Sequence, residues 1–173
     1  STYTFSKSID DQSGDTANSA QDPNNLRAER GLSDFDYRHR FSTSAVYALP
    51  FFGARRDAIA RVFGGWELSN IIIFQSGVPF TPNLTTDPAN TGSSKRPNRI
   101  ANGSLNTPAV DHWFDVAAFQ IPAAFTYGNS GRNILAGPPL KNWDMGVLKN
   151  FSLRMLREGM RLQFRGEIFN VTN

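Results

Sequence analysis

The segment MRLQFRGEI, residues 160–168, carries the clearest structural signal in this chain. Its side chains divide into an apolar set and a polar set that alternate: Met160, Leu162, Phe164 and Ile168 against Arg161, Gln163, Arg165 and Glu167. Successive side chains of an extended strand point to opposite faces, so the pattern predicts a β-strand with one apolar and one polar face. A strand of a soluble β-sandwich and a strand of a membrane β-barrel share this pattern, because each has two chemically different faces.

Four more segments alternate in the same way, over residues 2–6, 40–49, 66–75 and 142–147. A short stretch at 57–63 predicts one or two helical turns that end at Gly64-Gly65. About five strands with almost no helix predict an all-β fold over residues 1–173, built as a curved antiparallel sheet.

The connections between the predicted strands alternate in length. Those over 50–65 and 156–159 are the shorter ones, and those over about 10–36 and 79–141 are the longer ones. Long loops are uncommon in compact soluble domains, whereas outer-membrane barrels have short turns at one end and long loops at the other. The alternation therefore favours part of a large outer-membrane β-barrel with long extracellular loops.

Composition is compatible with that interpretation. Hydrophobic residues make up 39% of the 173 residues and the mean hydropathy is -0.39. The longest purely apolar run is Ile71-Ile72-Ile73-Phe74, far short of the roughly 20 residues that a membrane-spanning helix needs. The net charge of +3 is dispersed, so no nucleic-acid partner is predicted. Cysteine is absent, which excludes disulfides and thiolate metal sites within this sequence.

Eight phrases along the chain resemble one family of TonB-dependent receptor-like barrels. They are YTFSKSIDD (3–11), RAERGLSDFD (27–36), RHRF (38–41), GGWEL (64–68), FQSGVPF (74–80), GRNILAGP (131–138), NWDM (142–145) and RLQFRGEIFN (161–170). The family is familiar from Acidobacteria-type genomes, and its members often carry a carboxypeptidase-regulatory-like domain at the N-terminus. The phrases occur in the order in which that family presents them.

The resemblance implies a C-terminal piece of an outer-membrane barrel, commonly of 22 strands, that takes up a bulky nutrient such as an oligosaccharide. Its implied partners are outer-membrane lipid, an unknown nutrient ligand, and a plug domain and the TonB complex reached through an upstream region. Plug and TonB box would precede residue 1, and the final strands would follow residue 173. The sequence is therefore expected to be a fragment that leaves two sheet edges unpaired.

The polar face of the segment 160–168 supplies one set of candidate site residues. Arg161, Gln163, Arg165 and Glu167 would face the lumen if this strand spans the membrane. Contact with oxygen-rich substrate is the functional interpretation, and electrostatic lining or contact with the plug is the structural one.

An aromatic stretch of the second long connection supplies the other set. His112, Trp113 and Phe114 are predicted to contact ligand, because aromatic surfaces suit sugars; packing between loops is the structural alternative. No catalytic constellation appears, so no enzymatic activity and no cofactor are predicted. Asp10, Asp11 and Asp15 lack the spacing of an EF-hand, so no metal site is predicted.

Two other functions stay open at this point. One is a soluble β-sandwich that binds carbohydrate, and the other is a structural or adhesive outer-membrane barrel without transport. A sandwich requires the apolar faces to meet across two packed sheets, whereas a barrel segment requires them to share one face of a single sheet.

Overall fold

The computed structural model describes residues 1–13, 20–52, 57–92, 95–153 and 158–172, and these fold as two compact units. The sheet unit comprises residues 1–4, 39–75 and 140–173. The loop unit comprises residues 5–38 and 76–139, the two long connections of the sequence. Each unit is described by itself.

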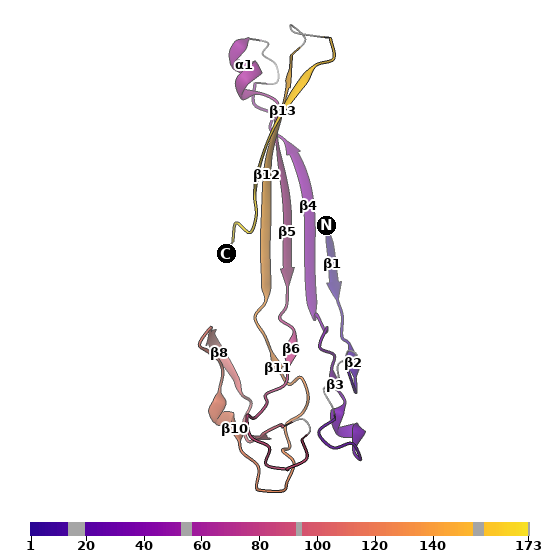
Figure 1. Cartoon of the computed structure of the whole chain (residues 1–173). Coiled ribbons are helices and arrows are strands. Elements are labelled where there is room, and N and C mark those ends of the chain that lie inside the picture. Colours follow the sequence, from indigo (N-terminus) through magenta and orange to yellow (C-terminus); the bar gives the residue numbers. More distant parts are fainter. Residues whose placement is uncertain (14–19, 53–56, 93–94, 154–157, 173) are drawn as a thin grey trace. The chain divides into compact units, whose positions relative to one another are not determined.

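The sheet unit is built on one five-stranded sheet whose spatial order follows the chain (Figure 1). Its strands are β1 (Thr2–Phe5), β4 (His39–Ala48), β5 (Trp66–Gln75), β12 (Leu140–Ser152) and β13 (Arg161–Ile168). The pairs β4–β5, β5–β12 and β12–β13 are antiparallel. β1 and β13 stand at the margins, so each leaves one edge without a strand partner within the described sheet.

All five predicted strands are present, and the all-β prediction is confirmed. The largest difference concerns β12, which runs over Leu140–Ser152 where the alternation predicted only 142–147. Lys141 and Lys149 take positions on its otherwise apolar face, as their register partners Phe74 and Trp66 show. Two cations at apolar positions interrupt the pattern, which is why the sequence understated this strand.

The strand register divides the sheet into an apolar and a polar face, because residues directly opposite each other point the same way. Ile72 lies between Thr43 and Trp143, and Leu68 lies between Tyr47 and Val147. Continuing across β12 and β13, the apolar face contains these apolar residues of the predicted strands 40–49, 66–75 and 160–168: Phe41, Tyr47, Leu68, Ile72, Phe164 and Ile168. The polar face holds the alternate residues, with Arg40, Ser42 and Ser44 on β4.

The apolar face decides between the sandwich and the single sheet. Its large side chains are half-buried or exposed; Tyr47 is 57% exposed and Ile168 is 53% exposed. No second sheet occurs among the described residues of the sheet unit. The predicted apolar set therefore lies on one face of a single sheet, which contradicts the sandwich alternative.

The two ends of the sheet differ in what they connect. Arg40, Gln75 and Leu140 lie in register, so the chain passes into and out of both long connections at that end. At the other end lie α1 (Ala58–Phe63) and the turn at Glu158-Gly159 (Figure 1). Asp57 caps α1 by accepting a hydrogen bond from the Ala60 amide, so the predicted short helix is confirmed. Leu156 and Arg157 of the predicted turn lie outside the described residues.

The described part of the chain contains no helix of the length and apolar character that crossing a membrane requires.

Among its described residues, the loop unit contains four two-stranded sheets that the sequence patterns did not predict. The pairs are β2 (Ile9–Asp10) with β3 (Gly31–Leu32), β6 (Pro79–Phe80) with β11 (Leu135–Ala136), β7 (Asn98–Arg99) with β10 (Phe119–Gln120), and β8 (Ser104–Ala109) with β9 (His112–Phe114). Two 3-10 helices, η1 (Leu26–Glu29) and η2 (Val116–Ala118), complete it. All of these strands except β8 have only two or three residues, too few for a period to show.

The interior of the loop unit is mainly polar. Among the described residues its buried hydrophobic side chains are Ala118 and Leu135, whereas its buried polar ones are more numerous: Ser13, Gln21, Glu29, Ser33, Asp36, Arg96, Ser130 and Asn133. Buried polar groups stabilise a fold only when they are paired. The hydrogen-bond networks described below therefore carry much of this unit's structure.

Candidate functional site

The polar face of the sheet contains all four residues predicted to face the lumen. Arg165 and Glu167 form an ion pair, and the Gln163 side-chain amide donates to the side-chain oxygen of Asn150 at 3.1 Å. Arg161 lies opposite Ser152 in the register. These side chains are exposed, and they share the face opposite Leu162, Phe164 and Ile168. The structure thus brings them together on one surface, while contact with lumen, plug or substrate stays a prediction.

Two polar groups on the apolar face, those of Trp143 and Lys149, are paired with neighbouring residues. The Trp143 indole donates to the Asn70 side-chain oxygen at 3.0 Å. Lys149 is 2% exposed, and its ammonium lies 5.4 Å from the Trp66 ring centroid and 4.9 Å from that of Phe151. The same ammonium donates to the Gly64 carbonyl at the end of α1. Cation–π contacts and one carbonyl thus keep this buried lysine paired.

Arg132 joins the two long connections of the loop unit. Its guanidinium donates to the Glu29 carbonyl at 2.9 Å, to the Ser13 hydroxyl at 3.1 Å and to the Asp10 carbonyl at 2.8 Å. It also forms ion pairs with Asp10 and, at 3.6 Å, with Asp34. We call these residues the Arg132 network. Two of the aspartates that the sequence left without a role, Asp10 and Asp34, are therefore partners of an arginine about a hundred residues further along the chain.

Asn133 extends this link. Its side-chain amide donates to the Leu32 carbonyl and to the Asp34 carboxylate, each at 2.6 Å. Its backbone amide donates to the Thr81 hydroxyl at 2.8 Å. The segment Gly131-Arg132-Asn133 thus binds to two phrases that are far from it in the chain, SIDD (8–11) and RGLSD (30–34).

A second network lies deeper in the loop unit. The Arg96 and Glu29 side chains form an ion pair while 2% and 6% exposed. Gln21 donates its backbone amide to Glu29 at 3.0 Å and its side-chain amide to the Gly128 carbonyl at 2.8 Å. The side-chain oxygen of Gln21 accepts from the backbone amide and Nε of Arg96, each at 3.2 Å. We call Gln21, Glu29, Arg96 and Gly128 the Arg96 network.

The Asp10 carboxylate gives the loop unit a pH dependence that can be tested. Burial by itself raises the pKa of Asp10, but hydrogen bonds from Ser13, Ser33 and Arg132 and the charge of Arg132 outweigh it and lower the pKa. A lowered pKa contributes stability that is fully present above the unfolded value of about 3.9 and is lost as pH falls through the folded value. We therefore expect deuterium exchange around residues 5–13, corrected for the intrinsic rate, to increase below about pH 4.

The matched control for this prediction is Asp10→Asn, which removes the titrating group. That variant should exchange faster at neutral pH and lose the acid-dependent step. An acid-dependent step of the same size in Asp10→Asn would assign the effect to another carboxylate.

The aromatic stretch predicted to contact ligand divides between packing and surface. Phe114 lies against Phe80 and Phe119, with ring centroids 5.8 Å apart in each pair, so this side chain belongs to a packed aromatic cluster. The half-buried Trp113 donates its indole N–H to the Ala136 carbonyl at 2.8 Å. His112 is exposed beside the β8–β9 turn. The structure favours the packing alternative for Phe114, and ligand contact by His112 and Trp113 stays a prediction.

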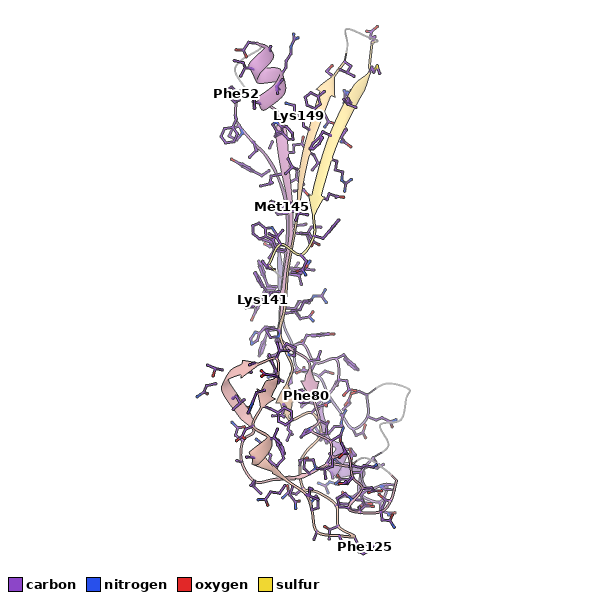
Figure 2. All side chains as sticks on the ribbon, turned by 60° about the vertical axis from the view of Figure 1, so that its left-hand side comes forward. Phe52, Phe80, Phe125, Lys141, Met145 and Lys149 are labelled. Carbon is purple, nitrogen blue, oxygen red and sulfur yellow. The ribbon has the colours of Figure 1, made fainter. Side chains whose placement is uncertain are left out.

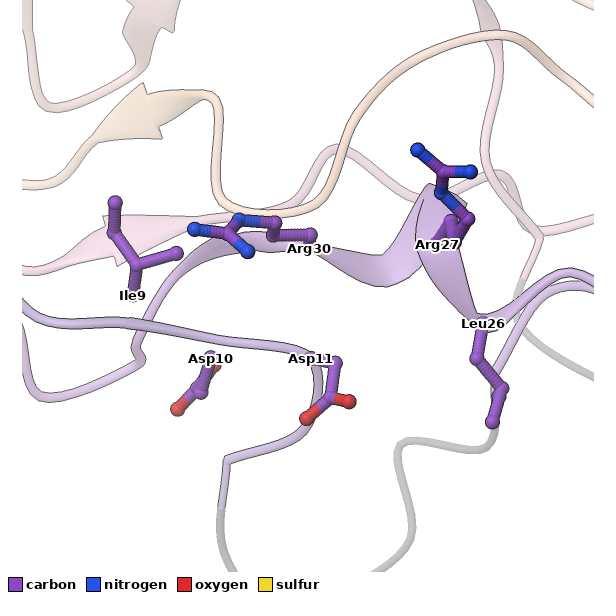
Figure 3. A pocket seen from close by; sticks show the side chains of 6 residues that line it. All are labelled: Ile9, Asp10, Asp11, Leu26, Arg27 and Arg30. Atoms are coloured by element: carbon purple, nitrogen blue, oxygen red, sulfur yellow. The ribbon is translucent and has the colours of Figure 1, made fainter.

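An open cavity of about 380 Å³ lies in the loop unit beside η1 (Figure 3). Ile9, Asp10, Asp11, Leu26, Arg27 and Arg30 line it. In Figure 3 the Arg27 and Arg30 guanidinium groups lie on the opposite side of the backbone from the two carboxylates. The exposed Ile9 and Leu26 add apolar surface beside these charges. The cavity could not be predicted from the sequence, because residues 9–11 and 26–30 become neighbours only through the β2–β3 pairing.

The loop unit also displays a separate aromatic tip. Phe125 is 79% exposed, has a positive φ of 62°, and donates its amide to the Pro88 carbonyl at 2.7 Å (Figure 2).

Among the described residues, no group of three or more histidine, cysteine, aspartate or glutamate side chains is placed to hold a metal ion. Asp15, the third aspartate considered from the sequence, lies outside the described residues.

Of the comparisons with known proteins, the one with sequence families gave a match. Neither the curated proteins nor the solved structures gave a match to this chain. The sequence model of one family, described as outer membrane beta barrel domain, matches residues 1–173. This match supports the predicted localisation in the outer membrane and the predicted membrane-lipid context of the domain. The chain belongs to the outer membrane β-barrel domain family.

Proposed function

We propose that this chain forms wall and external loops of a TonB-dependent receptor-like transporter that takes up a bulky nutrient, with an oligosaccharide as the leading class. The main observation in support of this proposal is that both long connections begin and end at the same end of the sheet and fold into one cross-linked unit. The Arg132 and Arg96 networks hold these loops in one folded shape, and a preformed surface favours ligand capture. In the proposed mechanism these loops capture the ligand, and a plug moved by TonB admits it.

The surfaces proposed to meet ligand are chemically suited to a polar, hydroxyl-rich molecule. The loop-unit cavity is lined by two guanidinium groups, two carboxylates and two apolar side chains: those of Arg27, Arg30, Asp10, Asp11, Ile9 and Leu26. On the sheet, Arg161, Gln163, Arg165 and Glu167 supply donors and acceptors along one strand. Sugars bind to such mixtures of charged hydrogen-bonding groups and apolar surface. We propose no catalytic role for any of these residues.

A transporter of the proposed type would also contain a plug domain and a TonB-contacting segment. The first check of the proposal is therefore to search the sequence of the full-length gene product for a plug domain and a TonB-contacting segment. A structural or adhesive barrel, the second candidate, would lack them.

Uptake measurement tests the transport step itself. Cells that express the full-length protein would be given fluorescent maltohexaose and fluorescent xylohexaose, with and without an uncoupler of the proton gradient. Energy-coupled transport predicts accumulation of at least one probe that requires the protein and stops when the uncoupler is added. Accumulation that persists with the uncoupler would indicate a passive pore, and full-length protein without a plug would favour the structural barrel.

A further inference from the structure

The connection between β4 and β5 exposes apolar side chains at the end of the sheet where the shorter connections lie. Five large hydrophobic residues there are 39–59% exposed: Phe51, Phe52, Ile59, Val62 and Phe63. Ile59, Val62 and Phe63 stand at helical spacing on one face of α1, and the Phe52 and Phe63 ring centroids are 6.4 Å apart. We call these five residues the α1 cluster.

Two hydrogen bonds place α1 on the apolar side of the sheet. The Trp66 indole donates to the Val62 carbonyl at 3.2 Å, and the Lys149 ammonium donates to the Gly64 carbonyl. Trp66 and Lys149 are register partners on the apolar face. The α1 cluster is thus continuous with the face that meets lipid in an outer-membrane barrel.

A cavity of about 800 Å³ separates α1 from the end of the sheet. Among the residues that the structure describes, its lining includes two cations, Arg61 and Lys149, together with Phe52 and Phe151, and no carboxylate. Arg61 is exposed, whereas Lys149 is buried and already bonded to Gly64. The cavity therefore presents positive charge and aromatic surface side by side, which complements an anionic headgroup with its first acyl carbons.

We propose that the α1 connection is a phospholipid-binding foot of the barrel. The α1 cluster inserts at the headgroup–acyl boundary of the periplasmic leaflet, the side on which outer-membrane barrels have their shorter connections. A phospholipid headgroup occupies the cavity with its phosphate at Arg61. Lys149 acts as a positioning residue, because it holds the end of α1 against the sheet. This inference rests on membership of the barrel family and does not depend on transport.

Spin-label accessibility tests the foot in the intact protein. Single-cysteine variants Val62→Cys and Phe63→Cys of the full-length protein would be labelled and reconstituted in phosphatidylglycerol–phosphatidylethanolamine vesicles. Glu158→Cys, in the β12–β13 turn at the same end of the sheet, is the matched control. The proposal predicts an oxygen-to-nickel-chelate accessibility ratio several-fold higher at positions 62 and 63 than at 158. Boiling-dependent gel migration would verify that each variant is folded.

The headgroup contact needs its own variant. Arg61→Gln in the Val62→Cys background should reduce the depth of the label in phosphatidylglycerol vesicles, and it should do so less in phosphatidylcholine vesicles. Nickel accessibility at 62 and 63 equal to that at 158 would overturn the proposal. The proposal would also be overturned if neither oxygen nor the nickel chelate reached the labels at 62 and 63. That result would show that another protein segment or a second copy covers the cluster. Because two cluster positions are labelled separately, failure of one variant to fold leaves the other as the test.

Discussion

Replacing Glu29 by alanine is expected to cost the loop unit about 3–5 kcal/mol, the range found when one partner of a buried ion pair is removed. Arg96 would keep its charge while 2% exposed and lose its carboxylate partner. The Gln21 backbone amide would lose its acceptor at the same time. We expect deuterium exchange to rise sharply in both long connections, since the Arg96 network holds them together.

Glu29→Gln is the matched control, because it removes the charge but keeps an oxygen that accepts from Gln21 and Arg96. Its cost should be clearly smaller than that of Glu29→Ala. Arg165→Met breaks an ion pair whose partners are 59% and 39% exposed, and such exposed pairs contribute at most about 1 kcal/mol. Equal exchange in Glu29→Ala and wild type would mean that the Arg96 network does not stabilise the loop unit.

Substitution by arginine should destabilise the barrel at one of two adjacent isoleucines and have little effect at the other. Ile72 lies on the apolar face between Thr43 and Trp143, whereas Ile71 lies on the polar face between Ser44 and Asp144. Arginine facing lipid near the bilayer midplane costs about 2–4 kcal/mol, and polar residues are tolerated on a lumen face. Ile72→Arg should therefore destabilise the folded barrel by that amount, and Ile71→Arg should have little effect, since Asp144 lies opposite.

The comparison can be measured by refolding both full-length variants into vesicles across a urea series, with boiling-dependent gel migration as the measure of folding. The same residue type is replaced at neighbouring positions, so differences in strand propensity cancel. A larger loss for Ile71→Arg than for Ile72→Arg would reverse the assignment of the two faces.

The strands could be predicted from the sequence because their pattern is local. The alternation over 160–168 corresponds to β13 at Arg161–Ile168, and the segment 66–75 corresponds to β5. The strand prediction was incomplete where a charged residue interrupts the apolar pattern and is paired within the fold. Lys149 is the clearest case, since its apolar position is tolerated through Trp66, Phe151 and the Gly64 carbonyl.

The loop unit could not be predicted in the same way, because its contacts link residues far apart in the chain. Arg132 and Asp10 are separated by 122 positions, and Gln21 and Gly128 by 107. No window of sequence contains both partners, and strands such as β2 and β7 are only two residues long. The sequence did find the aromatic stretch at 112–114, but only coordinates could separate the packed Phe114 from the exposed His112.

The candidate site residues also divide into those that one strand pattern predicts and those that only the folded chain brings together. The four polar residues of β13 were predicted together because they are alternate residues of one strand. The cavity at Arg27 and Arg30 was missed because its two segments meet only after β2 pairs with β3.

The most direct test of the account is the behaviour of the full-length gene product on membrane fractionation and gel electrophoresis. A sheet with one lipid-facing side is stable only as part of a closed barrel, because its two edge strands must be paired within the membrane. We predict recovery in the outer-membrane fraction and a shift in gel migration when the sample is boiled. A soluble product whose migration does not change on boiling would contradict the account.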